Sequence, residues 1–117
     1  MGYEQFSIKQ GKLGIIHSDD KMTVGYMIIN NGEEIVKHAR PLDEEIFQLS
    51  GNSVLTLYEN GEAREITLNE GDAYTVPANI PHGHINKNSM VKSITLWKFH
   101  GDMTGIVEEI KRNRSID

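Results

Sequence analysis

Short runs rich in Val, Ile, Leu, Thr, Tyr and Phe alternate along most of the chain with polar turn signals such as NNG, SGN, ENG and NEGD. β-Branched and aromatic residues favour strands, and Asn-Gly between two such runs is typical of a two-residue hairpin turn. Many short strands separated by turns predict an all-β sandwich or barrel. We expect strands near residues 3–8, 12–17, 21–30, 33–40, 44–50, 53–59, 62–68, 73–77, 82–87 and 90–99.

The pattern changes after residue 101. In the segment DMTGIVEEIKRN the apolar residues recur at helical spacing, at Met103, Ile106, Val107 and Ile110. Basic residues follow at the C-terminal end, where they complement the helix dipole. The segment therefore predicts a short helix over about 103–113. We expect its charged face to be solvated and its apolar side to cover one end of the barrel or a dimer partner.

Composition and charge narrow the function classes. A chain of 117 residues is expected to form one domain, over residues 1–117. The net charge of −5, with no basic cluster, argues against a nucleic-acid partner. The lack of cysteine excludes disulfides and thiol nucleophiles. Because the sequence shows neither an apolar run long enough to span a membrane nor a signal peptide, we expect a cytoplasmic protein with no membrane partner.

Two segments combine strand signals with ionisable residues at defined spacing. The first, GEEIVKHARPLDEEIFQLSG, has the pattern G-x5-H-x-R-x3-E-x6-G, formed by Gly32, His38, Arg40, Glu44 and Gly51. The second, GDAYTVPANIPHGHIN, has the pattern G-x5-P-x-N-x2-H-x3-N, formed by Gly71, Pro77, Asn79, His82 and Asn86. The prolines of the second segment predict a stiff corner that brings its first histidine into the next strand at a fixed angle.

Strand geometry predicts which of these side chains meet. Residues i and i+2 of a strand share a face, so His38 shares a face with Arg40, and His82 with His84. If the sheets close into a barrel, His38, Glu44 and His82 converge inside it. Two neutral imidazoles and one carboxylate can bind a divalent metal ion and leave positions open for water or substrate.

The two patterns resemble the paired motifs of the cupin superfamily, in its small single-domain form with one conserved barrel. The resemblance covers about residues 20–100 and keeps every spacing, but Arg40 stands where the family has a second histidine, and Asn79 where it has a glycine. Asn tolerates left-handed backbone geometry, so the second departure is mild. The resemblance implies an all-β double-stranded β-helix, that is, a jelly-roll cupin barrel, followed here by the short C-terminal helix.

The resemblance also implies roles for individual residues. His38, Glu44 and His82 would bind a divalent metal ion such as Zn, Fe, Mn or Ni. From the residues themselves, we expect Arg40 and His84 to be the catalytic residues, with Arg40 holding an acidic group and His84, whose unperturbed pKa is near neutral, acting as general acid or base. The pocket for a small, anionic ligand would be lined by Arg40, Tyr26, His84 and Trp97. An enzyme of this kind would be a metal-dependent dioxygenase, an isomerase or epimerase, or a lyase.

Several alternatives stay open at this point. Arg40 binds an anionic group beside the metal, forms an ion pair with Glu44 that replaces the metal, or extends to the barrel mouth. His84 is a fourth ligand or a pocket residue, and Glu45 replaces Glu44 if the register slips by one residue. The alternative function is that of a metal-free, non-catalytic cupin that binds or senses a small molecule.

The resemblance further implies a homodimer. The two earliest predicted strands, 3–8 and 12–17, are candidates for completing the sheet of a neighbouring copy instead of their own.

Overall fold

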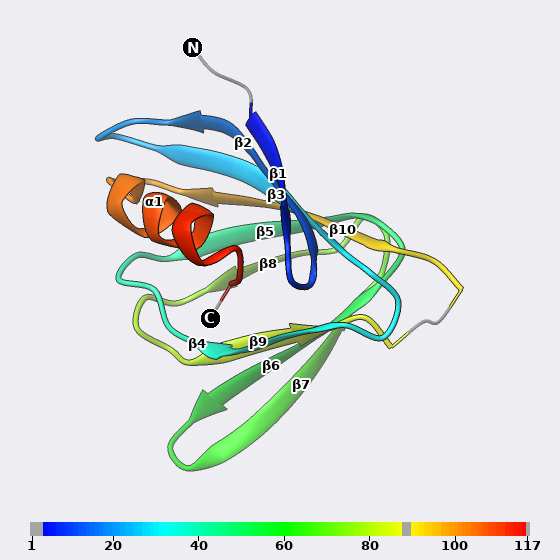
Figure 1. Cartoon of the computed structure of the whole chain (residues 1–117). Helices are drawn as coiled ribbons and strands as arrows, with labels where there is room; N and C mark the ends of the chain where they lie inside the picture. Colours follow the sequence, from blue (N-terminus) through cyan, green and yellow to red (C-terminus); the bar gives the residue numbers. More distant parts are fainter. Residues whose placement is uncertain (1–3, 88–89, 117) are drawn as a thin grey trace.

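The computed structural model describes residues 4–87 and 90–116, which form two antiparallel sheets and one helix (Figure 1). All ten predicted strands are present, which confirms the predicted fold class, although residue 3 of the first predicted strand lies outside the described residues. The strands are β1 (Glu4–Ile8), β2 (Gly11–Ser18), β3 (Thr23–Ile29), β4 (Glu34–His38), β5 (Glu44–Ser50), β6 (Ser53–Glu59), β7 (Glu62–Leu68), β8 (Ala73–Val76), β9 (His82–Ile85) and β10 (Ser93–Phe99).

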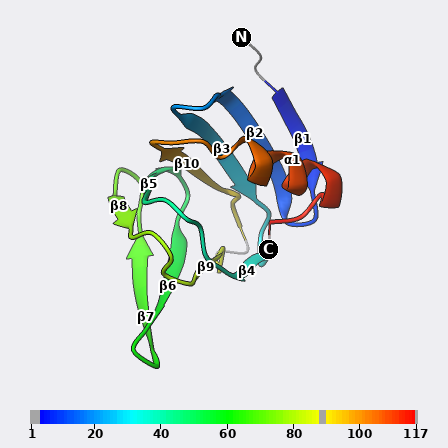
Figure 2. The ribbon, with the colours of Figure 1, turned by 90° about the vertical axis from the view of Figure 1, so that its left-hand side faces the viewer.

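The two sheets interleave strands that are distant in sequence. One sheet has the order β1-β2-β3-β10-β5-β8 and the other the order β4-β9-β6-β7. Figures 1 and 2 show the sheets facing each other, with the β6–β7 hairpin extending beyond the rest of the barrel. The expectation that the first two strands complete a neighbour's sheet is wrong, because β1 and β2 pair with each other and β2 pairs with β3 of the same chain.

Alternation along the strands places the core between the sheets. In β3 and β10 every second side chain is buried, as the period of a strand with one inward face requires. Apolar residues from both sheets and from the C-terminal segment form one buried cluster, which includes Leu13, Met27, Ile35, Leu55, Leu57, Trp97, Phe99, Met103 and Val107. This cluster fills the barrel around the site that is described next.

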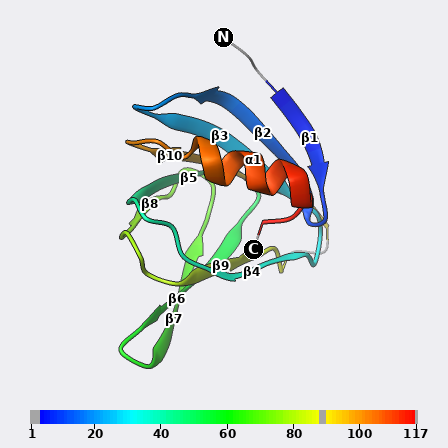
Figure 3. The same ribbon diagram turned by 60° about the vertical axis from the view of Figure 1, so that its left-hand side comes forward.

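The helix α1 (Thr104–Asn113) forms where the apolar spacing predicted it. In Figure 3 it lies between the six-stranded sheet and strands β4 and β9. Polar contacts join its C-terminal end to the first hairpin: Lys111 Nζ lies 3.1 Å from Glu4 Oε1, and Lys9 N–H donates to the Arg114 carbonyl at 2.8 Å. Met103 and Val107 are buried in the core, so the apolar side of α1 covers one end of the barrel. No helix in the described part of the chain is long and apolar enough to cross a membrane.

Candidate metal and ligand site

The first residue of β5 points into the barrel and the second points out. Glu44 is 7% exposed, whereas Glu45 lies on the solvent side and pairs with His100. Inside, Glu44 Oε1 lies 3.2 Å from Nε2 of His82, the first residue of β9. The register is therefore the predicted one, and Glu45 does not replace Glu44 at this position.

The corner before β9 is held against the loop before β5. Asn79 has a φ of 65°, the left-handed geometry that its place in the motif requires. Its N–H donates to the Arg40 carbonyl at 2.7 Å, and Ala78 N–H donates to Asp43 Oδ1 at 2.7 Å. These two hydrogen bonds fix the loop that leads to Glu44 relative to the corner that leads to His82. The acceptor role of Asp43 has no local sequence signal, because its partner lies 35 residues away.

Gly83 allows β9 to lie close to β4. A Cβ atom at Gly83 would come within 2.8 Å of the Ile35 carbonyl oxygen, so any side chain would push the two strands apart. The close approach pairs His38 with His82 across the strands, and their ring centroids lie 4.5 Å apart. This small residue between two histidines therefore brings the third predicted ligand next to the Glu44–His82 pair.

Backbone carbonyls determine which ring nitrogen of each histidine is protonated. His82 Nδ1 lies 2.9 Å from the Ile80 carbonyl and His38 Nδ1 lies 2.9 Å from the Val36 carbonyl. A carbonyl can only accept, so each Nδ1 carries a hydrogen and the neutral ring has its lone pair on Nε2. Metal-binding histidines are usually held in this way, with one nitrogen donating to a carbonyl and the other facing the ion.

The contact between His82 and Glu44 joins two acceptors when the imidazole is neutral. A proton on Nε2 or a cation between the two side chains resolves this conflict, so the donor set fits a divalent ion chemically. Within residues 4–87 and 90–116, no group of three or more His, Cys, Asp or Glu side chains is already arranged as a metal site. The structure thus brings Glu44 and His82 into contact and places His38 beside them.

Burial keeps the other two histidines neutral. It lowers the pKa of His84 to about 3, with a smaller contribution from His82, and it lowers the pKa of His38 to about 4, with a contribution from the positive charge of Arg40. His84 Nδ1 lies 3.5 Å from Ser53 Oγ, and its ring centroid lies 6.0 Å from that of His82. A neutral, buried His84 can take part in hydrogen bonds, but a pKa this low disfavours it both as a general base and as a general acid.

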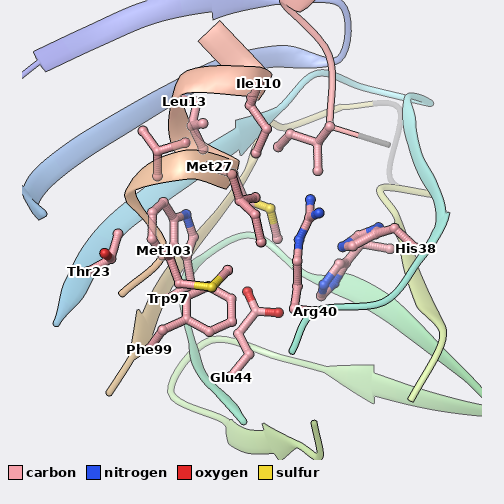
Figure 4. Close-up of a pocket in the computed structure, with 14 residues that line it drawn as sticks. Leu13, Thr23, Met27, His38, Arg40, Glu44, Trp97, Phe99, Met103 and Ile110 are labelled. Carbon is pink, nitrogen blue, oxygen red and sulfur yellow. The ribbon is translucent and has the colours of Figure 1, made fainter. Parts of the chain in front are cut away.

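A pocket lies between the candidate site and α1 (Figure 4). His38, Arg40, Glu44 and His84 line its polar end. Trp97 also lines the pocket. The remaining lining residues are Leu13, Thr23, Met27, Phe99, Met103, Ile106, Val107, Ile110 and Ile116.

One expectation about the pocket needs correction. Tyr26 lies on the opposite face of β3 from Met27, against Gly14, where a Cβ atom would lie 2.2 Å from the tyrosine ring. The side-chain period of two therefore removes Tyr26 from the pocket. Among the described residues, the ion pair of Glu44 is with His82 and not with Arg40. Figure 4 shows the Arg40 guanidinium directed towards Ile110 and away from the Glu44 carboxylate.

Comparison with known proteins agrees with this architecture. Residues 25–97, more than half of the chain, match the family model of the cupin domain. The chain belongs to the cupin family.

Curated relatives of this cupin match over parts of the chain. They include 3-hydroxyanthranilate 3,4-dioxygenases from Yarrowia lipolytica, 40% identical over 48 residues, and from Meyerozyma guilliermondii, 26% identical over 80 residues. These matches cover 41% and 68% of the chain, and the chain spans only 28% and 40% of the length of the two relatives.

Solved structures show the same fold at low identity. An RmlC-like cupin from Shewanella frigidimarina has a TM-score of 0.74 at 18% identity, over 89% of this chain and 88% of that one. Oxalate decarboxylase from Bacillus subtilis has a TM-score of 0.76 at 23% identity, over 85% of this chain and 28% of that one, and it is a protein with Mn(II) centres.

Proposed function

We propose that this cupin binds one divalent metal ion through His38, Glu44 and His82 and holds a small organic anion beside it. The observation that carries the proposal is the buried contact between Glu44 Oε1 and His82 Nε2, because the other nitrogen of that ring already donates to a carbonyl. Such a contact is most favourable with a cation between the two acceptors. The Mn(II) centres of the structurally similar oxalate decarboxylase support the same view.

The remaining pocket residues would bind and orient the ligand. Arg40 can hold a carboxylate or phosphate through two parallel N–H bonds. Trp97 would contact the body of the ligand, and neutral His84 would form a hydrogen bond to it. A bound metal ion would act as a Lewis acid or activate oxygen. A dioxygenase, an isomerase or epimerase, or a lyase would use this arrangement, and a sensing cupin would use the same pocket without turnover.

Metal content tests the proposal directly. The untagged protein is stripped with chelator, incubated with Zn, Mn, Fe or Ni, freed of unbound ions and measured by elemental analysis. We expect near-stoichiometric metal in the wild type and loss of it in His82→Ala. The control is His100→Ala, which removes an exposed histidine that also contacts a glutamate.

Either result is informative about the site. If neither the purified nor the titrated wild type binds metal, the buried pair is an ion pair between protonated His82 and Glu44, and the chain is a metal-free binding protein. If His82→Ala retains metal as well as the control does, the metal lies elsewhere in the protein. The single domain over 1–117, the homodimer and the cytoplasmic location stay predictions.

A further inference from the structure

The side of the pocket that α1 covers, which we call the roof, is formed by a part of the chain outside the matched cupin region. That region ends at residue 97, and the pocket residues beyond it are Phe99, Met103, Ile106, Val107, Ile110 and Ile116. All six are apolar, and four of them belong to α1 or to its first cap position. The barrel therefore supplies the polar end of the pocket, while the C-terminal segment supplies its apolar end.

The two ends of the pocket differ sharply in chemistry. Glu44, His38 and His84 lie at the polar end, and the Arg40 side chain runs from this end towards Ile110. Apart from Thr23 and Arg40, the rest of the lining is made of hydrocarbon, thioether and aromatic groups, with the Trp97 and Phe99 rings 5.9 Å apart. Figure 4 shows Ile110 at one end and Glu44 at the other, with the Arg40 side chain running between them. A ligand that fills this space meets the cation Arg40 and an otherwise largely apolar wall.

We propose that α1 selects an organic anion with a single charged group and an apolar body. This inference rests on the proposed binding of a small anion at the site. The charged group would lie against Arg40, whose five N–H donors allow it to bind an anion while keeping another interaction. The apolar body would lie under Met103, Ile106 and Ile110, where it leaves water and gains contacts. A compact dianion or a polyhydroxylated sugar would gain nothing from this roof and would lose its hydration there.

Entry of such a ligand requires α1 to move. The cavity under the helix encloses about 40 Å³, which is room for a few water molecules and not for an organic acid. The contacts that tie the far end of α1 to the barrel are exposed: Lys111 with Glu4, and Arg114 Nη1 with the Ser7 carbonyl at 3.4 Å. Exposed polar contacts of this kind are weak, so an outward shift of α1 is opposed mainly by the burial of Met103 and Val107 and by the hydrogen bond from the Lys9 N–H to the Arg114 carbonyl.

Calorimetry with four probes tests the proposed selectivity. Benzoate and hexanoate each carry one charge and an apolar body, oxalate carries two charges and no apolar body, and benzamide is the neutral analogue of benzoate. We expect benzoate and hexanoate to bind at least about tenfold more tightly than oxalate and benzamide, because only they satisfy both ends of the pocket. Hydrogen exchange in residues 104–113 should slow when benzoate binds, because the helix closes over the ligand.

Variants of the roof separate α1 from the rest of the site. Ile110→Ala should weaken benzoate and hexanoate binding by about threefold or more and leave oxalate binding unchanged, because it removes apolar contacts alone. Ile106→Ala is the second variant if the first does not fold. Arg112→Ala, an exposed position of the same helix, is the matched control. Metal content is measured for every sample.

Three outcomes would overturn the inference. They are oxalate binding as tightly as benzoate, no binding of any of the four probes, and roof variants whose affinity for benzoate stays within about twofold of the wild type. Titrations are run on both metal-free and Zn-treated protein. A protein that binds no metal but keeps the expected order of affinities contradicts the metal site and supports the role of α1. A protein that binds metal but shows no such order of affinities supports the metal site and contradicts the role of α1.

Discussion

Two histidine–glutamate pairs lie on opposite faces of β5 and have very different surroundings. Inside the barrel, Glu44 and His82 are 3.2 Å apart, with side chains 10% and 1% exposed. Outside, Glu45 and His100 are 2.9 Å apart, with side chains 52% and 61% exposed. The glutamates are neighbours in sequence, and the distances are similar. Residue type and contact distance therefore do not by themselves make a metal site.

The difference between the pairs is their access to water. Water and salt screen the outer pair, so the attraction between its two partners is weak. Inside, water cannot compensate an unmatched charge or an unpaired acceptor, so the inner pair needs a proton or a cation to complete it. The inner pair is therefore the one whose chemistry depends on what binds.

The largest expected difference between the two pairs concerns metal binding. Glu44→Gln should lower the affinity for Zn(II) by about 100-fold or more, because a neutral amide replaces a charged ligand. Glu45→Gln should leave the affinity within about twofold of the wild type. Thermal denaturation across a Zn(II) series measures both, since an ion present at about 100 times its Kd stabilises the folded state by about 2.7 kcal/mol. Equal Zn(II)-dependent stabilisation in the two variants would contradict the assignment of Glu44 as a ligand.

The pH dependence of stability tests whether His38 and His84 are shielded from water in the metal-free protein. Burial lowers the pKa of His84 to about 3 and, with Arg40, that of His38 to about 4, from 6.5. The unfolded chain therefore binds more protons than the folded chain below pH 6.5. The contribution of both groups to stability is intact above that pH and is lost as the pH falls towards 4.

Urea denaturation between pH 8 and pH 4.5 measures this slope. Each histidine contributes up to about 1.4 kcal/mol per pH unit within the window. His84→Leu should remove the contribution of one histidine to the slope of the unfolding free energy against pH. The difference in unfolding free energy between this variant and the wild type at pH 8 gives the effect of changed packing, which is subtracted. An unchanged slope in this variant would show that His84 is hydrated in solution.

The hydrogen bond from the Ala78 N–H to Asp43 joins the corner before β9 to the loop before β5. Its loss should affect metal binding at the inner pair, Glu44 and His82. Asp43→Ala removes the acceptor for Ala78 N–H, and Asp72→Ala removes a similar acceptor for Asn69 N–H in the loop between β7 and β8. Each change should destabilise the protein by about 1 kcal/mol. Only Asp43→Ala should also weaken Zn(II) binding, by about tenfold, because it loosens the corner before His82. Equal Zn(II) affinities of the two variants would show that Asp43 does not position the ligands.

The smallest expected effect is that of the outer pair. A double-mutant cycle with Glu45→Ala and His100→Ala, measured by urea denaturation, should give a coupling energy between zero and about 1 kcal/mol. Adding about 0.5 M NaCl should reduce it further, because salt screens exposed charges. A coupling energy that is larger or independent of salt would mean that this pair is less hydrated than its exposure indicates.

Much of the fold follows from local patterns. Turn residues and strand periodicity were sufficient to predict all ten strands and the fold class, because each strand buries one face against the opposite sheet. The same period predicted that Glu44 and Glu45 point to opposite faces of β5. Asn79 adopts the positive φ that its motif position requires.

Other features had no local signal. The exclusion of Tyr26 from the pocket depends on which face of β3 turns inward. The role of Asp43 depends on the corner at Ala78, and the close approach of β4 and β9 depends on Gly83. These are contacts between segments far apart in sequence, and no single stretch of residues contains both partners.

The sequence by itself determined the strand order along the chain, the family resemblance and the set of candidate ligands, because spacing and residue type are local properties. Only the tertiary structure decided that Glu44 pairs with His82 and not with Arg40, that His38 and His84 are held neutral, and that α1 closes the pocket. The physical reason is that burial, proton affinity and pocket shape depend on what surrounds a side chain. Those surroundings exist only once the two sheets and the helix have come together.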